Sequence, residues 1–139
     1  MKKAALAGLA IISILFIAPA CGKGGGGGGG GGCTETALAV STTPAINTTE
    51  PPAPGPDFPL TVNITGGMPA AGVTIQIKAH PDGSTTNFFA PTATSTTNAS
   101  NSFTITGTPA ATNAVVDITV TSKSCATNKW TGSYRYSRK

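Results

Sequence analysis

Side chains alternate between apolar and polar through much of the second half of the chain, and this alternation limits the fold more than any other feature. In residues 58–66, FPLTVNITG, every second residue from Phe58 to Ile64 is apolar. Residues 72–79, GVTIQIKA, repeat the pattern. Because successive side chains of a β-strand point to opposite faces, a period of two predicts strands with one buried face.

The alternation continues in shorter runs toward the C-terminus, and no segment of residues 21–139 shows the periodicity of a helix. Turn sequences such as GGMPAAG and HPDGS separate the runs. About seven short strands joined by such turns predict one antiparallel β-sandwich. Further predicted strands are 101–107, 114–122 and 129–137, and weaker candidates are 85–90 (TTNFFA) and 92–97 (TATSTT).

Two longer segments carry a family resemblance. They resemble bacterial immunoglobulin-like surface modules, in which a Gly/Pro turn leads into a GVTI strand. The segments are PLTVNITGGMPAAGVTIQIKA and, later, SFTITGTPAATNAVVDITVTS. The same turn resembles the G-x-P-x-x-G-V turn of carboxypeptidase regulatory-like modules. The resemblance covers residues 57–137. It implies an immunoglobulin-like sandwich that serves as a spacer, adhesion or accessory module, and it supplies no catalytic residues.

The N-terminus has the three-part layout of an export signal. Residues 1–3 are Met-Lys-Lys, residues 4–17 form an uncharged apolar run, and residues 18–20 are Ala-Pro-Ala. The apolar run is shorter than the about 20 residues of a membrane-spanning helix. This pattern predicts a cleaved signal peptide over residues 1–20.

Cys21 follows the small residues of the signal directly. This arrangement resembles the lipobox of bacterial lipoproteins, although Ala18 stands where leucine is usual and Pro19 is uncommon at its position. The resemblance implies that Cys21 is lipidated and anchors the mature chain to membrane lipid. Gly22 in the next position resembles the outer-membrane sorting class. The alternative is ordinary cleavage at the same place and secretion.

The segment between Cys21 and the sandwich has the composition of a linker. Nine consecutive glycines, Gly24–Gly32, cannot bury apolar surface and predict a flexible tether. Residues 34–56 are rich in Thr and then in Pro, which favours an extended, disordered chain. We therefore expect a linker over 21–56 and a sandwich domain over 57–139, although residues 35–41 are also compatible with a short strand.

The chain has three cysteines, so one is left over from any intramolecular pair. If Cys21 is lipidated, Cys33 and Cys125 remain to form a disulfide in an oxidising compartment. Such a bond would fix the far end of the glycine run to the domain. No CxxC motif and no Cys/His cluster is present, so no zinc or redox site is expected.

Few residues offer chemistry for catalysis. His80 is the only histidine, no G-x-S-x-G motif is present, and the acidic residues of the domain (Asp57, Asp82 and Asp117) are scattered along it. From residue 21 onward the chain has seven Lys and Arg residues and five acidic ones. It therefore has no concentrated basic surface of the kind that binds nucleic acid. We expect no enzyme activity, no cofactor, no metal site and no nucleic-acid partner.

Three aromatic residues, Trp130, Tyr134 and Tyr136, fall on one face of the predicted strand 129–137. Exposed on a sheet, they would stack against sugar rings or anchor a protein partner. Alternatively, the last strand buries its large side chains and turns Arg135 to water.

The sequence thus favours a non-catalytic interaction or structural module of the bacterial cell envelope, which is anchored in the outer membrane and binds another envelope protein. The alternative is a carbohydrate-binding or adhesin-like module that binds polysaccharide through the aromatic face. In the secreted alternative the glycine run is merely a leader.

Overall fold

The computed structural model describes residues 33–139, which form seven β-strands and, within that range, no helix. The predicted signal peptide, Cys21 and the glycine run lie outside the described residues. The strands are β1 (Ala39–Thr43), β2 (Phe58–Gly66), β3 (Val73–Pro81), β4 (Thr94–Thr96), β5 (Ser100–Ile105), β6 (Thr112–Ser122) and β7 (Lys129–Arg138).

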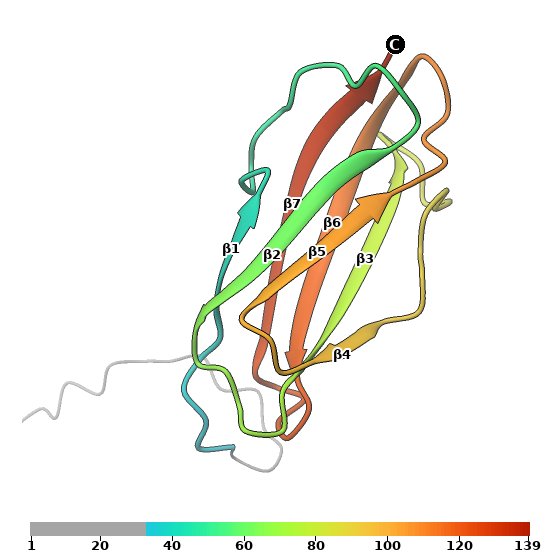
Figure 1. The fold of residues 1–139 in the computed structure, drawn as a ribbon. Helices are drawn as coiled ribbons and strands as arrows, with labels where there is room; N and C mark the ends of the chain where they lie inside the picture. Colours follow the sequence, from blue (N-terminus) through green and yellow to red (C-terminus); the bar gives the residue numbers. More distant parts are fainter. Residues whose placement is uncertain (1–32) are drawn as a thin grey trace, which may run out of the picture. The chain divides into compact units, whose positions relative to one another are not determined.

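The strands form two antiparallel sheets that face each other (Figure 1). One sheet has three strands in the order β1-β2-β5, and the other has four in the order β4-β3-β6-β7. The chain crosses between the sheets from β2 to β3, from β4 to β5 and from β5 to β6, as in the Greek-key connections of immunoglobulin-like sandwiches. The predicted all-β sandwich is confirmed.

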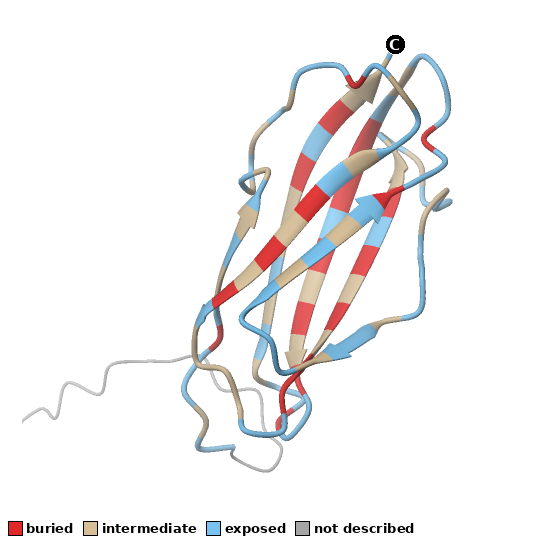
Figure 2. Cartoon of the chain, in the orientation of Figure 1, coloured by how far each residue is buried: buried red, intermediate tan, exposed pale blue. Residues whose placement is uncertain are grey.

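The core lies between the two sheets and is built from the apolar members of the alternating runs. Figure 2 shows buried residues recurring at every second position along the long strands. Ile75 on β3 and Ile118 on β6 are 1% and 0% exposed, and the polar residues between the buried ones face water. The predicted inward faces of β2, β3 and β6 are therefore correct. The buried apolar residues of these three strands are Leu60, Val62, Ile64, Val73, Ile75, Ile77, Ala79, Ala114, Val115, Val116, Ile118 and Val120.

The sandwich begins earlier than the predicted boundary at residue 57. β1 pairs with β2, and after the cis peptide bond before Pro44 the chain crosses to the other sheet. There residues 47–53 run parallel to β7, with the Glu50 N–H donating to the Arg135 carbonyl at 2.8 Å. Leu38 and Ala53 are buried in the core. The predicted linker is therefore wrong for residues 38–53, because its few apolar residues stand within a Thr- and Pro-rich composition. The alternative of a short strand at 35–41 is confirmed in part, since β1 begins at Ala39.

The candidate strand at 85–90 is also not formed. In this segment Phe89 makes a single bridge to Ala79 of β3, and both Phe88 and Phe89 pack, half-buried, against the core. The weaker candidate at 92–97 is confirmed in part, as the three-residue strand β4. The two phenylalanines turn toward the core as strand residues do, which explains why the TTNFFA pattern resembled a strand, although the backbone forms no continuous ladder.

Candidate functional site at the tether attachment

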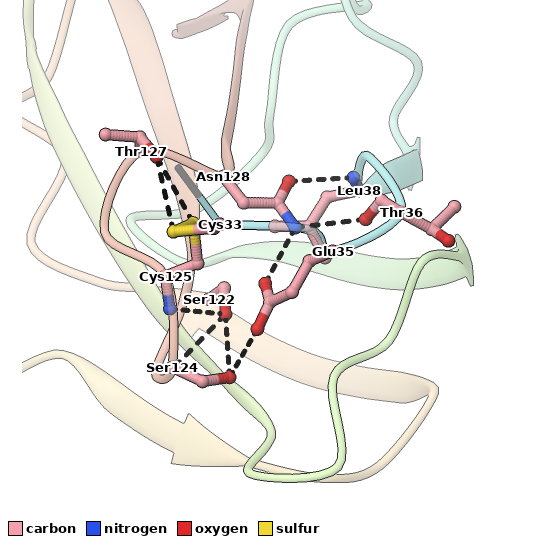
Figure 3. Close-up of a disulfide and its surroundings, with 9 residues drawn as sticks. All are labelled: Cys33, Glu35, Thr36, Leu38, Ser122, Ser124, Cys125, Thr127 and Asn128. Carbon is pink, nitrogen blue, oxygen red and sulfur yellow. Dashed lines mark hydrogen bonds between the residues drawn. A yellow bond between two sulfur atoms is a disulfide. The ribbon is translucent and has the colours of Figure 1, made fainter. Parts of the chain in front are cut away.

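A disulfide joins Cys33 to Cys125 across 92 residues of sequence, with the two Cα atoms 5.8 Å apart (Figure 3). The predicted pair is confirmed. Cys33 directly follows the glycine run, and Cys125 lies in the turn between β6 and β7. The bond therefore fixes the chain, as it leaves the glycine run, to one end of the sandwich, which we call the proximal end.

Asn128 holds the residues after Cys33 by a second, polar set of contacts. Its Nδ2 donates to Glu35 Oε2 and to the Thr36 carbonyl, both at 3.0 Å. Its Oδ1 accepts from the Leu38 N–H at 3.1 Å (Figure 3). One side chain thus spans three positions of the N-terminal segment. We call Cys33, Glu35, Cys125 and Asn128 together the N-terminal clamp.

Glu35 connects the clamp to the serines of the β6–β7 turn. Ser124 Oγ donates to Glu35 Oε1 at 2.5 Å, and Ser122 Oγ accepts from the backbone N–H groups of Ser124 and Cys125. Hydrogen bonds from Ser124, then Asn128 and Ser122, lower the pKa of the Glu35 carboxyl below its usual value. The clamp therefore favours an ionised Glu35.

The turn between β2 and β3 closes against the same segment. Gly67 has a φ of 70°, and a Cβ atom there would lie 2.2 Å from the Ala37 carbonyl oxygen. Only glycine allows this approach, because it combines a left-handed backbone with the absence of a side chain. The proximal end is thus formed by three segments that are distant in sequence.

The tyrosines of the predicted aromatic face do not form a binding surface. Tyr134 and Tyr136 are each 1% exposed. Phe58 stacks on Tyr136 with ring centroids 4.2 Å apart, and Tyr136 shares a buried hydrogen bond with Thr108. Burial raises the pKa of both tyrosines. The alternative that β7 buries its large side chains and exposes Arg135 is confirmed for this pair.

Trp130 is half-buried and also packs against the core. A Cβ atom on Gly132 would lie 2.6 Å from both the Trp130 ring and the Ile46 side chain, so these two groups meet over the glycine. The three aromatic residues therefore share a face, as predicted, and that face turns inward.

The outer face of the four-stranded sheet carries most of the charged side chains of the strands. His80 Nε2 lies 3.2 Å from Asp117 Oδ2, and Arg135 Nε lies 3.5 Å from Asp82 Oδ2. The Nδ1 atom of His80 contacts the Pro81 carbonyl at 2.9 Å. Both ring nitrogens of His80 thus lie beside oxygen atoms of the fold, the Asp117 carboxylate and the Pro81 carbonyl.

Beside Asp117 lies a shallow, open groove of about 460 Å³, which the cross-strand pairs Asp117–Ser133 and Thr119–Thr131 line together with Asn47. Within residues 33–139 no group of three or more potential metal ligands comes together. The described residues also include no helix long and apolar enough to cross a membrane.

Sequence reasoning missed Glu35 and Asn128, since each is a common surface residue without a motif. Their only signal is position: Glu35 lies two residues after Cys33, and Asn128 lies three residues after Cys125. No protein-family model matches the chain. A search of curated proteins finds no match either.

Proposed function

We propose that this protein is a non-catalytic interaction module of the bacterial cell envelope, held to the outer membrane by a lipid on Cys21. The observation that carries the proposal is the Cys33–Cys125 disulfide at the end of the glycine run. Structural disulfides form in oxidising compartments outside the cytosol. The pairing also leaves Cys21 as the remaining cysteine of the three.

The clamp gives the tether a mechanical role. Because Cys33 is bonded to the β6–β7 turn, a pull along the tether is transmitted into the proximal end and not into the edge strand β1. The eleven residues 22–32 have a root-mean-square reach of about 18 Å. That reach holds the proximal end near the lipid surface and leaves the opposite, distal end to face a partner.

The distal end consists of the loop that leads into β2, the loop that follows β3 and the loop between β5 and β6. Residues 54–57, 82–87 and 106–111 are mostly exposed there, and the chain ends beside them at Lys139 (Figure 1). Loops on a rigid scaffold are the usual place for recognition. We assign contact with another envelope protein to this end.

The anchor is tested by fractionating cells of the native host that produce the wild-type chain or Cys21→Ser. We expect the wild type in the membrane fraction, with an intact mass that fits an acylated chain beginning at Cys21. The Cys21→Ser variant should leave the membrane. Cys33→Ser/Cys125→Ser is the matched control and should remain membrane-bound. A wild type found in the medium at its unmodified mass would favour the secreted alternative and overturn the proposal.

The polysaccharide alternative has less support because the two tyrosines on which it relied are buried. A carbohydrate module needs flat aromatic surface open to the ligand. Titration with envelope polysaccharides, followed by Trp130 fluorescence, separates the two functions. A saturable change in Trp130 fluorescence, in a domain that stays folded, would favour the carbohydrate-binding alternative.

A further inference from the structure

The three-stranded sheet ends in a regular, open edge at β5. β5 pairs with β2 over six consecutive residues without a register shift, and within the described chain no strand pairs with its other side. Ser100, Ser102 and Thr104 are all exposed. An edge strand of this kind presents a row of backbone N–H and C=O groups that lack strand partners.

The hydrogen-bond pattern identifies which backbone groups face outward. The Ile64 N–H donates to the Ala99 carbonyl at 2.7 Å, so this pair is of the hydrogen-bonded kind. Such pairs alternate along an antiparallel ladder, and the next ones are Val62–Asn101 and Leu60–Phe103. The residues between them direct their N–H and C=O groups away from β2. These residues are Ser100, Ser102 and Thr104.

The other long edges of the sandwich are covered. Residues 47–53 run along β7, with the Asn47 N–H donating to the Ser133 carbonyl at 2.7 Å. β4 covers the start of β3, and farther along β3 Gln76 Nε2 donates to the Pro91 carbonyl at 2.9 Å. β1 is only five residues long, and its chain turns away at Pro44.

β5 also lacks the usual devices against strand pairing. Its sequence, SNSFTI, contains no proline and no charged residue, whereas natural edges are commonly protected by Lys, Pro or a bulge. The strand is moreover self-complementary. If two copies pair in antiparallel orientation about Ser102, Ser100 of each copy lies opposite Thr104 of the other, and every outward pair is hydroxyl with hydroxyl.

We propose that β5 is a docking edge for a second copy of this chain. Pairing of the two edges about a twofold axis at Ser102 joins the two three-stranded sheets into one continuous six-stranded sheet. The dimer satisfies the outward backbone groups of Ser100, Ser102 and Thr104 in both copies. It also brings Asn101 of one copy opposite the half-buried Phe103 of the other. The inference does not depend on the lipid anchor.

The first test is a disulfide across the twofold axis. The full chain with Ser102→Cys, produced in its host, is oxidised and run on a non-reducing gel beside the wild type and Thr61→Cys. Thr61 shares the outer face with Ser102 but lies on β2, which is paired on both sides. We expect a dimer band with Ser102→Cys that reduction removes, at least tenfold stronger than with the other two proteins. Equal bands in all three would show random collision and overturn the proposal.

The second test measures the mass of the exported chain by light scattering over a range of concentrations. The wild type should reach twice the monomer mass. Ser102→Lys should remain monomeric, because it places like charges directly opposite each other at the axis. Thr61→Lys, on the same face, should still dimerise. A wild type that stays monomeric at the highest concentration, together with an absent cross-link in the Ser102→Cys variant, would refute the docking edge.

Discussion

The two ends of the sandwich are held together by different kinds of interaction. At the proximal end a disulfide and the hydrogen bonds of Asn128 and Glu35 join segments whose residues are mostly exposed or half-exposed, although Cys125 itself is buried. At the distal end Phe58 and Tyr136 stack in the core beside Tyr134, and Thr108 reaches in from the β5–β6 loop to share a hydrogen bond with Tyr136.

Because of this difference, the two ends stabilise the protein in different ways. Ring burial removes a large apolar area from water and stabilises the fold at any redox state. The clamp buries little apolar area, and its covalent bond acts chiefly by restricting the unfolded chain. We therefore expect distal substitutions to destabilise the folded core directly, and proximal ones to act through the unfolded chain and to change how the tether is held.

Tyr136→Ala should have the largest effect. It removes a ring that is 1% exposed and stacked on Phe58, and truncation of a buried aromatic residue costs about 3–5 kcal/mol. Urea unfolding of the exported domain measures the change. Arg135→Ala, on the exposed side of the same strand, is the control and should change stability by less than about 1 kcal/mol. Equal losses would contradict the distinct role of the inward face.

Cys33→Ser/Cys125→Ser should lower the free energy of unfolding by about 2–4 kcal/mol, since the bond closes a long loop in the unfolded chain. The fold should persist, because Leu38 and β1 are held by burial and by pairing with β2. Hydrogen exchange should show new exposure only ahead of Leu38. Loss of protection in β2 would mean that the clamp, and not the core, holds the N-terminal strand.

Two matched substitutions probe the hydroxyls of the distal end. Tyr136→Phe removes the partner of Thr108 and should destabilise the domain by about 1 kcal/mol. Tyr134→Phe should be neutral or stabilising, because the Tyr134 hydroxyl is buried without a hydrogen-bond partner within residues 33–139. Thermal unfolding of the two variants measures both effects. A larger loss of stability in Tyr134→Phe than in Tyr136→Phe would contradict this assignment.

The smallest effect belongs to Glu35. Its pKa is lowered in the folded state by hydrogen bonds from Ser124, Asn128 and Ser122. Its contribution is therefore present above the unfolded pKa, near 4.5, and is lost as the pH falls through the lowered folded value. Thermal midpoints of the wild type and Glu35→Gln should differ at pH 6 and converge in strong acid. A difference that is constant with pH would exclude this mechanism.

The strands with strict alternation were predictable to within two residues. β2 coincides with the predicted run 58–66, and β6 extends the predicted run 114–122 by two residues at its start. Burial on one face imposes a period of two that is visible without the fold. The disulfide was predictable as well, because the predicted export signal and lipidation of Cys21 left only Cys33 and Cys125 to pair.

The N-terminal segment shows where prediction failed. Residues 47–53 have no alternation of their own, and their position is set by backbone hydrogen bonds to β7. A backbone bond leaves no mark on side-chain type, so composition alone assigned this segment to the linker. Asn128 likewise contacts residues that are close in space but distant in sequence, and its bond to Leu38 spans 90 residues.

The sequence by itself determined the all-β class and the inward faces of the main strands, since both follow from side-chain chemistry along the chain. The pairing of Cys33 with Cys125 followed from the sequence only on the condition that Cys21 is lipidated. The tertiary structure alone decided that residues 38–53 join the sandwich, that Tyr134 and Tyr136 turn inward and that β5 is left as an open edge. The direction in which a strand face or edge points depends on its neighbours in space, and those neighbours are fixed only when the two sheets pack.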